Sequence, residues 1–272
     1  MYINPELIDE LKRSKVILFV GAGVSANLGL PSWSELINHM AQELDFDPRT
    51  FRSYGDFLEL AEYYEIKKGS IGPLRSWMDV SFHDPSINIK ESRIHELIAK
   101  FNFHIIYTTN YDRWIERAFE AHGVEYVKVT NIFDLTKLRS GITQIIKFHG
   151  DFDDDSSIVL TESSYFNRLG FEGPLDMKLR SDILGKSILF IGYSLKDIDM
   201  RYLLFKLNKL WEGYSSDTVR PKSYIFTLSN NPIQRDVLER RCVDTIVADD
   251  ENPQHALEEF LATISKEAAG AP

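Results

Sequence analysis

Continuous runs of apolar residues recur along the chain and are separated by stretches with the periodicity of amphipathic helices. The runs lack the alternating polar positions of a half-exposed strand, which is typical of parallel strands covered by helices on both faces. They lie at residues 16–20, 103–107, 126–129, 144–148, 158–160, 187–191, 223–228 and 245–247. Helical patterns occupy residues 112–121, 197–211, 232–240 and 254–266. This order predicts an α/β fold with a Rossmann-like, mostly parallel sheet.

The interval from about residue 34 to residue 100 departs from this alternation, because it is mostly helical and rich in aromatic residues. An excursion of this length between the first and second strands predicts a helical subdomain inserted beside the sheet. We expect its aromatic side chains to form a core rather than a ligand cage. The expected organisation is one domain over residues 1–272, with the insertion at about 34–100, a C-terminal helix at about 254–266 and a frayed tail from residue 268.

Composition narrows the class of protein. The 272 residues carry 31 Lys and Arg against 41 Asp and Glu, a net charge of −10 without a long basic stretch, so direct binding to nucleic acid is not expected. The single cysteine, Cys242, can form neither an intrachain disulfide nor a cysteine zinc cluster, which suits a reducing cytosol. No signal peptide pattern and no apolar run of membrane-spanning length occurs, so we expect a cytoplasmic protein without membrane contact.

The first apolar run leads into a glycine-rich turn, Gly21-Ala22-Gly23-Val24-Ser25, followed by Ala26. Gly21 would permit a tight turn, Gly23 would let the backbone approach a pyrophosphate, and Ala26 would be a third small position where a helix packs on the strand. Backbone N–H groups at such a helix start favour an anion. A glycine turn after any buried strand has a similar pattern, so a purely structural turn is the alternative.

Polar residues follow the strand at 103–107, in the sequence Thr108-Thr109-Asn110-Tyr111-Asp112. Helix capping is one interpretation, since Thr, Asn and Asp are all favoured N-caps. One residue suffices for a cap, however, and this segment carries both an amide and a carboxylate at a strand end. In a doubly wound sheet the carboxyl ends of the strands bind ligands, so a chemical role for Asn110 and Asp112 is the second interpretation.

His149 ends the strand at 144–148 and is followed by Gly150, which lets the backbone turn. The ordinary pKa of histidine suits a general base near neutral pH, although most histidines are structural hydrogen-bonding groups. The other histidines form no metal-ligand spacing. A further glycine turn, Gly192-Tyr193-Ser194, follows the strand at 187–191; it is either an anion-facing helix start or a helix capped by Ser194 or Asp197.

In chain order, these four segments resemble the sirtuin superfamily. Residues 21–25 with Leu30-Pro31 are similar to its Gly-Ala-Gly-x-Ser…Gly-Ile-Pro loop, and residues 109–112 to its Thr-Gln-Asn-Ile-Asp box. His149-Gly150 is similar to its catalytic His-Gly pair, and residues 192–195 to its Gly-Thr-Ser-Leu turn. The resemblance covers about residues 16–197 and implies a Rossmann-like sheet that binds NAD. The NAD contacts that it implies come from Gly21, Ala22, Gly23, Ser25, Thr109, Asn110, Gly192 and Ser194.

Departures from the sirtuin pattern indicate a branch of the superfamily. The interval 151–191 contains no cysteine, whereas deacylating sirtuins carry a four-cysteine zinc module there that helps frame the acyl-lysine groove. Residues 31–34, Pro-Ser-Trp-Ser, stand where the family has Pro-Asp-Phe-Arg, so an active-site arginine is missing. With the helical insertion, these changes resemble the bacterial sirtuin-like domains of anti-phage defence systems. The resemblance implies a zinc-free NAD+ hydrolase that releases nicotinamide and ADP-ribose.

The same resemblance implies roles for the catalytic residues. Asn110 would orient water or a ribose hydroxyl, Asp112 would stabilise the developing positive charge, and His149 would act as base. Nicotinamide leaves as a neutral molecule, so the main tasks are positioning, ribose stabilisation and water delivery. A zinc-free NAD-dependent deacylase, which would form O-acetyl-ADP-ribose, and a non-catalytic sensor of NAD or ADP-ribose are the alternatives. A Rossmann oxidoreductase is disfavoured, since the second strand is followed by Thr-Thr-Asn-Tyr-Asp in place of a convincing acidic ribose-binding residue.

Regulation is the remaining expectation from the sequence. Unrestrained NAD hydrolysis is toxic, and no sensor domain is visible beside the catalytic domain and its insertion. We therefore expect control through assembly of a homo-oligomer or through a separate polypeptide. The family resemblance implies a HerA-type ATPase and DNA translocase as such a partner, so that contact with DNA would be indirect.

Overall fold

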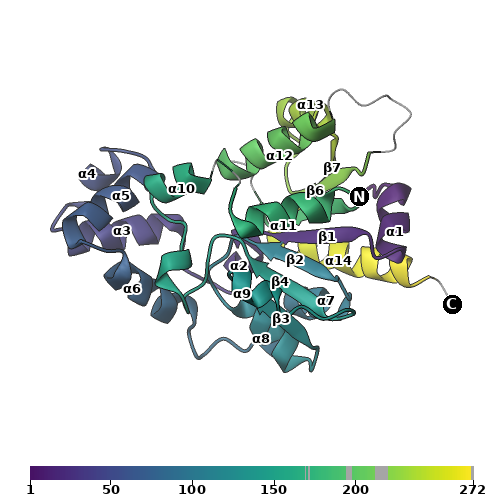
Figure 1. The fold of residues 1–272 in the computed structure, drawn as a ribbon, viewed down its shortest axis with the longest axis horizontal. Coiled ribbons are helices and arrows are strands. Elements are labelled where there is room, and N and C mark those ends of the chain that lie inside the picture. The colour runs from purple at the N-terminus through teal and green to yellow at the C-terminus, as the bar shows by residue number, and fades with distance from the viewer. Residues whose placement is uncertain (169, 171, 194–197, 212–219, 271–272) are drawn as a thin grey trace.

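The computed structural model describes residues 1–168, 170, 172–193, 198–211 and 220–270, and within these residues seven parallel strands form one sheet (Figure 1). The strands are β1 (Val16–Val20), β2 (Ile105–Thr108), β3 (Tyr126–Val129), β4 (Thr143–Lys147), β5 (Ser187–Ile191), β6 (Ser223–Thr227) and β7 (Val243–Val247). Their order is β3-β4-β2-β1-β5-β6-β7, and each neighbouring pair is parallel. The predicted α/β class and Rossmann-like sheet are confirmed.

Strand β1 lies at the centre of the sheet, with all five residues buried. It pairs with β5 from Val16 opposite Ser187 to Val20 opposite Ile191, and with β2 from Leu18 opposite Ile106 to Val20 opposite Thr108. The chain continues from β1 toward one edge of the sheet and from β5 toward the other. Ligands of doubly wound proteins bind at the carboxyl ends of strands at such a switch point.

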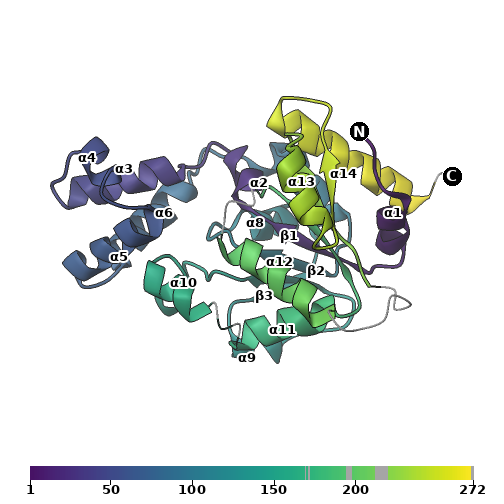
Figure 2. The ribbon, with the colours of Figure 1, turned by 90° about the horizontal axis from the view of Figure 1, so that it is seen from above.

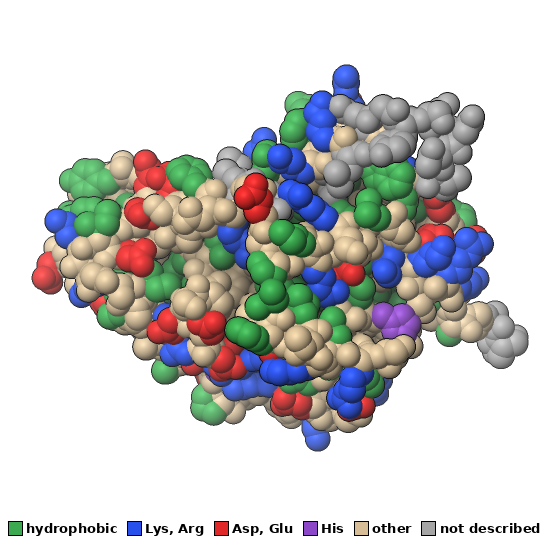
Figure 3. Space-filling model, in the orientation of Figure 1, with side chains coloured by type: hydrophobic (Ala, Val, Ile, Leu, Met, Phe, Trp, Pro, Cys, Tyr) green, Lys and Arg blue, Asp and Glu red, His purple; other side chains and the backbone are tan. Residues whose placement is uncertain are grey.

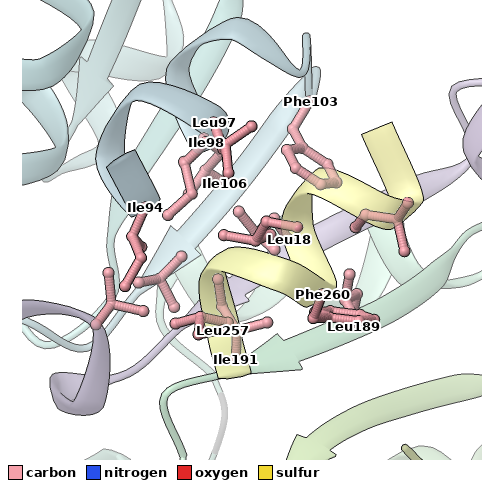
Figure 4. Packing of buried hydrophobic residues seen from close by; sticks show 14 of the residues in the cluster. Leu18, Ile94, Leu97, Ile98, Phe103, Ile106, Leu189, Ile191, Leu257 and Phe260 are labelled. Atoms are coloured by element: carbon pink, nitrogen blue, oxygen red, sulfur yellow. The ribbon is translucent and has the colours of Figure 1, made fainter. Parts of the chain in front are cut away.

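Helices cover both faces of the sheet. Successive side chains of a strand point to opposite faces, so Leu18 of β1 enters one core while Ile17 and Phe19 enter the other. Figure 4 shows Leu18 surrounded by side chains of α7 and α14. The first core is covered by α1 (Pro5–Lys12), α7 (Arg93–Lys100), α8 (Trp114–Ala121) and α14 (Pro253–Ala269). The second is covered by α11 (Pro174–Ile183), α12 (Ile198–Trp211) and α13 (Pro232–Glu239).

A separate group of helices lies beyond the carboxyl ends of the strands (Figures 1 and 2). These are α3 (Trp33–Glu43), α4 (Pro48–Arg52), α5 (Phe57–Lys68) and α6 (Gly72–Phe82), which we call the helical subdomain. Their apolar side chains form a third core around Met40, Phe51 and Tyr64. Capping boxes at Ser32 and Asp56 begin α3 and α5. Helix α7 also falls within residues 34–100, but it packs against the sheet core with α8 and α14.

Short elements complete the described part of the chain. They are α2 (Ala22–Ala26), α9 (Ile132–Leu135), α10 (Glu162–Arg168) and the 3-10 helices η1 (Ile89–Glu91) and η2 (Asp155–Ser157). None of the helices in the described ranges is long and apolar enough to cross a membrane. Acidic and basic side chains are interspersed on the face drawn in Figure 3.

Some expected boundaries are wrong. Residues 158–160 form no strand, although all three are buried, because Ile158 and Leu160 pack into the core of the helical subdomain. Helix α14 continues to Ala269, so Ala268 is helical and packs on the sheet core instead of belonging to a frayed tail. Helix α8 begins at Trp114, two residues after the expected start.

Replacing Phe260 of α14 by alanine tests the sheet core. Its side chain is fully buried and stacks on Phe226 at a centroid distance of 4.7 Å. We expect Phe260→Ala to lower the free energy of unfolding by about 3–5 kcal/mol, since it removes buried apolar area and leaves a cavity. The control Phe133→Ala removes a ring that is 76% exposed, and it should change stability by less than about 0.5 kcal/mol. Equal urea-unfolding midpoints for the two variants would contradict this packing.

Candidate active site

The glycine turn after β1 is interlocked with the turn after β5. The amide of Gly21 donates to the carbonyl of Ile191, and that of Gly23 to the carbonyl of Gly192, both at 2.9 Å. A Cβ at Gly21 would lie 2.6 Å from the Gly192 oxygen, and one at Gly23 would lie 2.9 Å from it. Gly192 has φ +70°, and its own Cβ would lie 2.7 Å from the Val24 nitrogen. These glycines are therefore required by a backbone-to-backbone approach within the chain itself.

Helix α2, which follows this turn, differs from the expectation in one respect. It spans five residues, and its buried side chains are Val24 and Ser25. Ala26 is exposed and lines a cavity, so the prediction that it packs the helix on the strand is wrong. A helix of one turn cannot bury every small residue, because its two sides face the sheet and the cavity.

A cavity of about 290 Å³ lies between the carboxyl edge of the sheet and the helical subdomain. The expected site residues that line it are Ala22, Gly23, Ser25, Thr109, Asn110, Asp112 and His149. Its remaining wall includes Trp33 and Leu36 of α3, Phe82 of α6 and Tyr165 of α10. Three segments that are far apart in the sequence therefore meet at one cavity.

The other residues that we expected to contact NAD are not among the described residues that line this cavity. Gly21 is buried and does not line the cavity, and Gly192 lines a neighbouring cavity of about 1010 Å³. Ala22, Gly23 and Trp33 line both cavities, so the glycine turn and this tryptophan stand where the two adjoin. Ser194 falls outside the described residues.

Asn110 is held by hydrogen bonds to the first turn. Its Nδ2 donates to the carbonyl of Gly21 at 3.2 Å and to Oγ of Ser25 at 3.1 Å. A carbonyl can only accept, so these contacts define which way the amide points. The side chain is 6% exposed, and its Oδ1 has no hydrogen-bond partner among the residues that the structure describes. A buried acceptor without a partner is costly, and a ligand hydroxyl or a water could satisfy it.

Asp112 has both a structural contact and access to the cavity. Its Oδ1 accepts the backbone N–H of Trp114 at 3.1 Å, so capping of the following helix is part of its role. The residue also lines the cavity and is 4% exposed. Thr109, in the same segment, shares a 2.8 Å hydrogen bond with the hydroxyl of Tyr193. Helix capping and a role in ligand binding or catalysis are therefore compatible interpretations of this segment.

His149 is 2% exposed, and Tyr165 packs edge-on against its ring at a centroid distance of 5.3 Å. Burial, with a smaller contribution from the positive charge of Arg168, lowers the pKa of His149 to about 3. The imidazole is therefore neutral around pH 7. The next residue, Gly150, has φ +93°, and a Cβ there would lie 2.2 Å from the carbonyl oxygen of Ser157. Only glycine allows this turn.

A cluster of buried charged side chains, which we did not expect from the sequence, lies next to Asp112. Lys147, fully buried, donates from Nζ to the carbonyl of Asp112 and lies 3.3 Å from Oε1 of Glu116 and 3.7 Å from Oδ2 of Asp151. Burial raises the pKa of Glu116, and the nearby Lys147 opposes that shift. The available signal is a lysine at the end of a strand that is otherwise mostly buried, since buried lysines are almost always paired.

Metal ligands are not grouped at this site. Within the described ranges, no three side chains of His, Cys, Asp or Glu are placed to hold one ion. Cys242 is half-buried and is the single cysteine of the sequence, so the residues present do not fit a four-cysteine zinc module.

The fold and the site together indicate the class of protein. Residues 104–246, more than half of the chain, match the family model described as the SIR2-like domain. The chain belongs to the SIR2-like family, as the order of its motifs predicted. A likeness in structure agrees with this fold: a mutant Sir2 homologue in complex with ADP-ribose superposes with a TM-score of 0.53 at 12% identity, covering 98% of this chain and 97% of that one.

Three bacterial proteins illustrate the similarity in sequence. The NAD(+) hydrolase ThsA of Bacillus cereus is 29% identical over 206 residues, which are 75% of this chain and 42% of the relative. ThsA of Enterococcus faecium is 28% identical over 89% of this chain and 54% of its own length. The defense-associated sirtuin 2 of Bacillus subtilis is 28% identical over 95% of this chain and 26% of its own length. The chain thus spans about half or less of these relatives.

Replacing Gly192 by alanine tests the interlocked turns. Gly29 is a matched control, because its φ is +76° but nothing lies within 4 Å of a Cβ placed there. Gly29→Ala should cost about 1–2 kcal/mol for the left-handed backbone alone. Gly192→Ala should cost about 1–3 kcal/mol more, since its methyl group also collides with the first turn. Urea unfolding of both variants measures the difference; equal losses would rule out the collision.

Acid should destabilise the fold through its buried histidines. Burial lowers the pKa of His95 to about 4 and that of His149 to about 3. In the unfolded chain both would bind protons near pH 6.5, so below that pH unfolding takes up protons and stability falls. Each contributes up to about 1.4 kcal/mol per pH unit over this window. In urea unfolding at pH 7, 6 and 5, His95→Gln should show a shallower decline than the parent, and an unchanged slope would contradict the burial effect.

Proposed function

We propose that this protein is an NAD+ hydrolase, which cleaves the bond between ribose and nicotinamide and releases nicotinamide and ADP-ribose. Membership of the SIR2-like family and similarity to proteins named NAD(+) hydrolases support this activity. The name of the Bacillus subtilis relative, defense-associated sirtuin 2, supports a role in anti-phage defence, in which the enzyme depletes NAD. The observation that carries the proposal is the cavity of about 290 Å³, where Asn110, Asp112 and His149 meet beside the glycine turn.

The two adjoining cavities suit the two halves of a dinucleotide. We assign the nicotinamide ribose to the 290 Å³ cavity and the adenosine half to the cavity of about 1010 Å³ that Gly192 lines. The pyrophosphate crosses the glycine turn, since Ala22 and Gly23 line both spaces. The Gly23 N–H already bonds to Gly192, so that N–H is not available to the phosphates, and this glycine keeps the two turns in contact beneath them.

The chemistry follows from the charges of the substrate. As the C–N bond breaks, its electron pair goes to the ring nitrogen, so nicotinamide leaves neutral and positive charge develops on the ribose. Water forms the new C–O bond and gives its proton to the neutral imidazole of His149. The free Oδ1 of Asn110 orients that water or a ribose hydroxyl, and the carboxylate of Asp112 stabilises the positive ribose.

Hydrolysis is favoured over deacylation by the packing of the segment after His149. Phe152, Ile158 and Leu160 pack into the core of the helical subdomain instead of framing a peptide groove. Glu62 of α5 closes this junction further, because its carboxylate accepts both the N–H and the hydroxyl of Ser163, each at 2.9 Å. An acylated lysine peptide would have to separate these contacts, whereas water needs no such opening.

The cellular setting is also part of the proposal. We place the enzyme in the cytoplasm, where NAD is available, and infer that it works as a homo-oligomer. A separate regulatory polypeptide, with a HerA-type ATPase and DNA translocase as the candidate, restrains it until infection. The net charge of −10 supports an indirect link to DNA through that partner.

Alanine variants of His149 and Asn110 test the activity. We expect each to lower nicotinamide release by at least about 10²-fold, since His149→Ala removes the base and Asn110→Ala removes the orienting acceptor. Nicotinamide, ADP-ribose and any O-acetyl-ADP-ribose are separated by liquid chromatography after incubation with NAD, with and without an acetylated peptide.

The exposed His255, which hydrogen-bonds Asp250, serves as the matched control, and His255→Ala should keep full activity. Circular dichroism must show that each variant is folded. Folded His149→Ala that still cleaves NAD would refute the assignment of the base, and formation of O-acetyl-ADP-ribose would favour a deacylase.

A further inference from the structure

The last turn of α6 is hydrogen-bonded to the segment that carries Asn110 and Asp112. His83, the C-cap of α6, has a side chain that is 6% exposed, and its Nε2 lies 3.0 Å from the backbone nitrogen of Arg113. A backbone N–H only donates, so Nε2 must be the accepting nitrogen. The hydrogen then sits on Nδ1, which lies 2.8 Å from the carbonyl and 2.9 Å from the carboxylate of Asp79. Only the neutral imidazole can make both contacts.

We call the hydrogen bond from the Arg113 N–H to Nε2 of His83 the clamp. Neighbouring contacts reinforce it. Nε1 of Trp114 donates to the carbonyl of Phe82 at 2.8 Å, and the backbone N–H of Trp114 donates to the carboxylate of Asp112. The guanidinium of Arg113 lies 3.4 Å from Asp79. Phe82 itself lines the cavity. The end of α6 thus contacts residues 113 and 114, while Lys147 at the end of β4 donates to the Asp112 carbonyl.

We propose that His83 is a positioning residue for NAD cleavage: by accepting the Arg113 amide hydrogen, it holds the turn that orients Asn110 and Asp112. This inference rests on the proposed function. His83 does not line the cavity, so it acts on the geometry of the reaction and not on the affinity for NAD. The last turn of α6 therefore completes the support of the site from the side of the helical subdomain.

Protonation of His83 would open the clamp. A hydrogen on Nε2 would point at the N–H of Arg113, and the acceptor would be lost. The charged groups that face the imidazole are Asp79 from its own helix, Arg113 from the following turn and Arg117 from α8; Asp151 and Asp153 in turn pair with Arg113. Burial is the main cause that lowers the pKa of His83; Asp79 opposes this shift, and the two arginines add to it. The clamp is therefore closed at pH 7 and opens in acid.

Two variants of His83 distinguish positioning from packing. His83→Leu fills the space without an acceptor, and His83→Gln offers an amide oxygen that cannot be protonated near neutral pH. The matched control is His39→Leu, because His39 belongs to the same subdomain but stacks on Trp77 and pairs with Glu43, away from the cavity. NAD turnover is measured from pH 4.5 to 8 by nicotinamide release.

We expect His83→Leu to lower kcat by roughly ten- to a hundredfold, the effect of one buried hydrogen bond, with KM for NAD changed less than about threefold. His83→Gln should keep kcat within about threefold at pH 7 and extend activity to lower pH than the parent. His39→Leu should behave as the parent. The proposal is overturned if His83→Leu keeps full kcat, or if His83→Gln loses as much activity as His83→Leu.

A second measurement does not depend on NAD cleavage. The chain has four tryptophans, so 15N-labelling of tryptophan yields four resolvable indole signals. In the parent, the chemical shift of the Trp114 signal should change as the pH falls below about 6.5. In His83→Leu it should already differ from the parent at pH 7, and in His83→Gln it should not depend on pH. If the parent cleaves no NAD but this titration is seen, the proposed function fails while the clamp stands. A Trp114 signal indifferent to both His83 substitutions would eliminate the clamp itself.

Discussion

The close approach of two backbone turns is the constraint on which the rest of the site depends. Gly21 and Gly23 touch Gly192 so closely that no side chain fits between β1 and β5 at their carboxyl ends. This contact places Ser25 and the carbonyl of Gly21 where Asn110 can hydrogen-bond to both. The orientation of the Asn110 amide, and hence its free Oδ1, follows from the packing of main chain against main chain.

The cavity has two supports of different chemical kinds. The sheet edge contributes polar groups at strand ends, held by the buried Lys147 and its carboxylate partners. Burying such charges is costly, and loss of one partner leaves an uncompensated ion, so this cluster defines one arrangement of the residues above it. The helical subdomain contributes an apolar wall and the hydrogen bonds from its last turn. Neither support alone encloses the space, because residues of both line the cavity.

Much of this arrangement can be predicted from the sequence, because carboxyl ends of parallel strands meet at one edge of a sheet. Asn110 and His149 end neighbouring strands, and their meeting needs only the correct strand order. The strand expected at residues 158–160 is wrong for a physical reason. Ile158 and Leu160 are buried in the core of the helical subdomain, and an apolar run indicates burial without showing whether its backbone pairs with a strand. The role of His83 has no signal in the sequence, because its partner is thirty positions away.

The sequence by itself determined the alternation of strands and helices, the glycines that permit a close turn and the order of motifs that marks the SIR2-like family. These are local properties, set by side-chain size, polarity and spacing. The tertiary structure decided which glycine contacts which backbone and that Lys147 donates to the carbonyl of Asp112. It also decided that Ala26 lines the cavity and that α6 contacts the turn after β2. Such contacts join residues far apart in the chain, and each depends on how elements are placed in space, which no local pattern encodes.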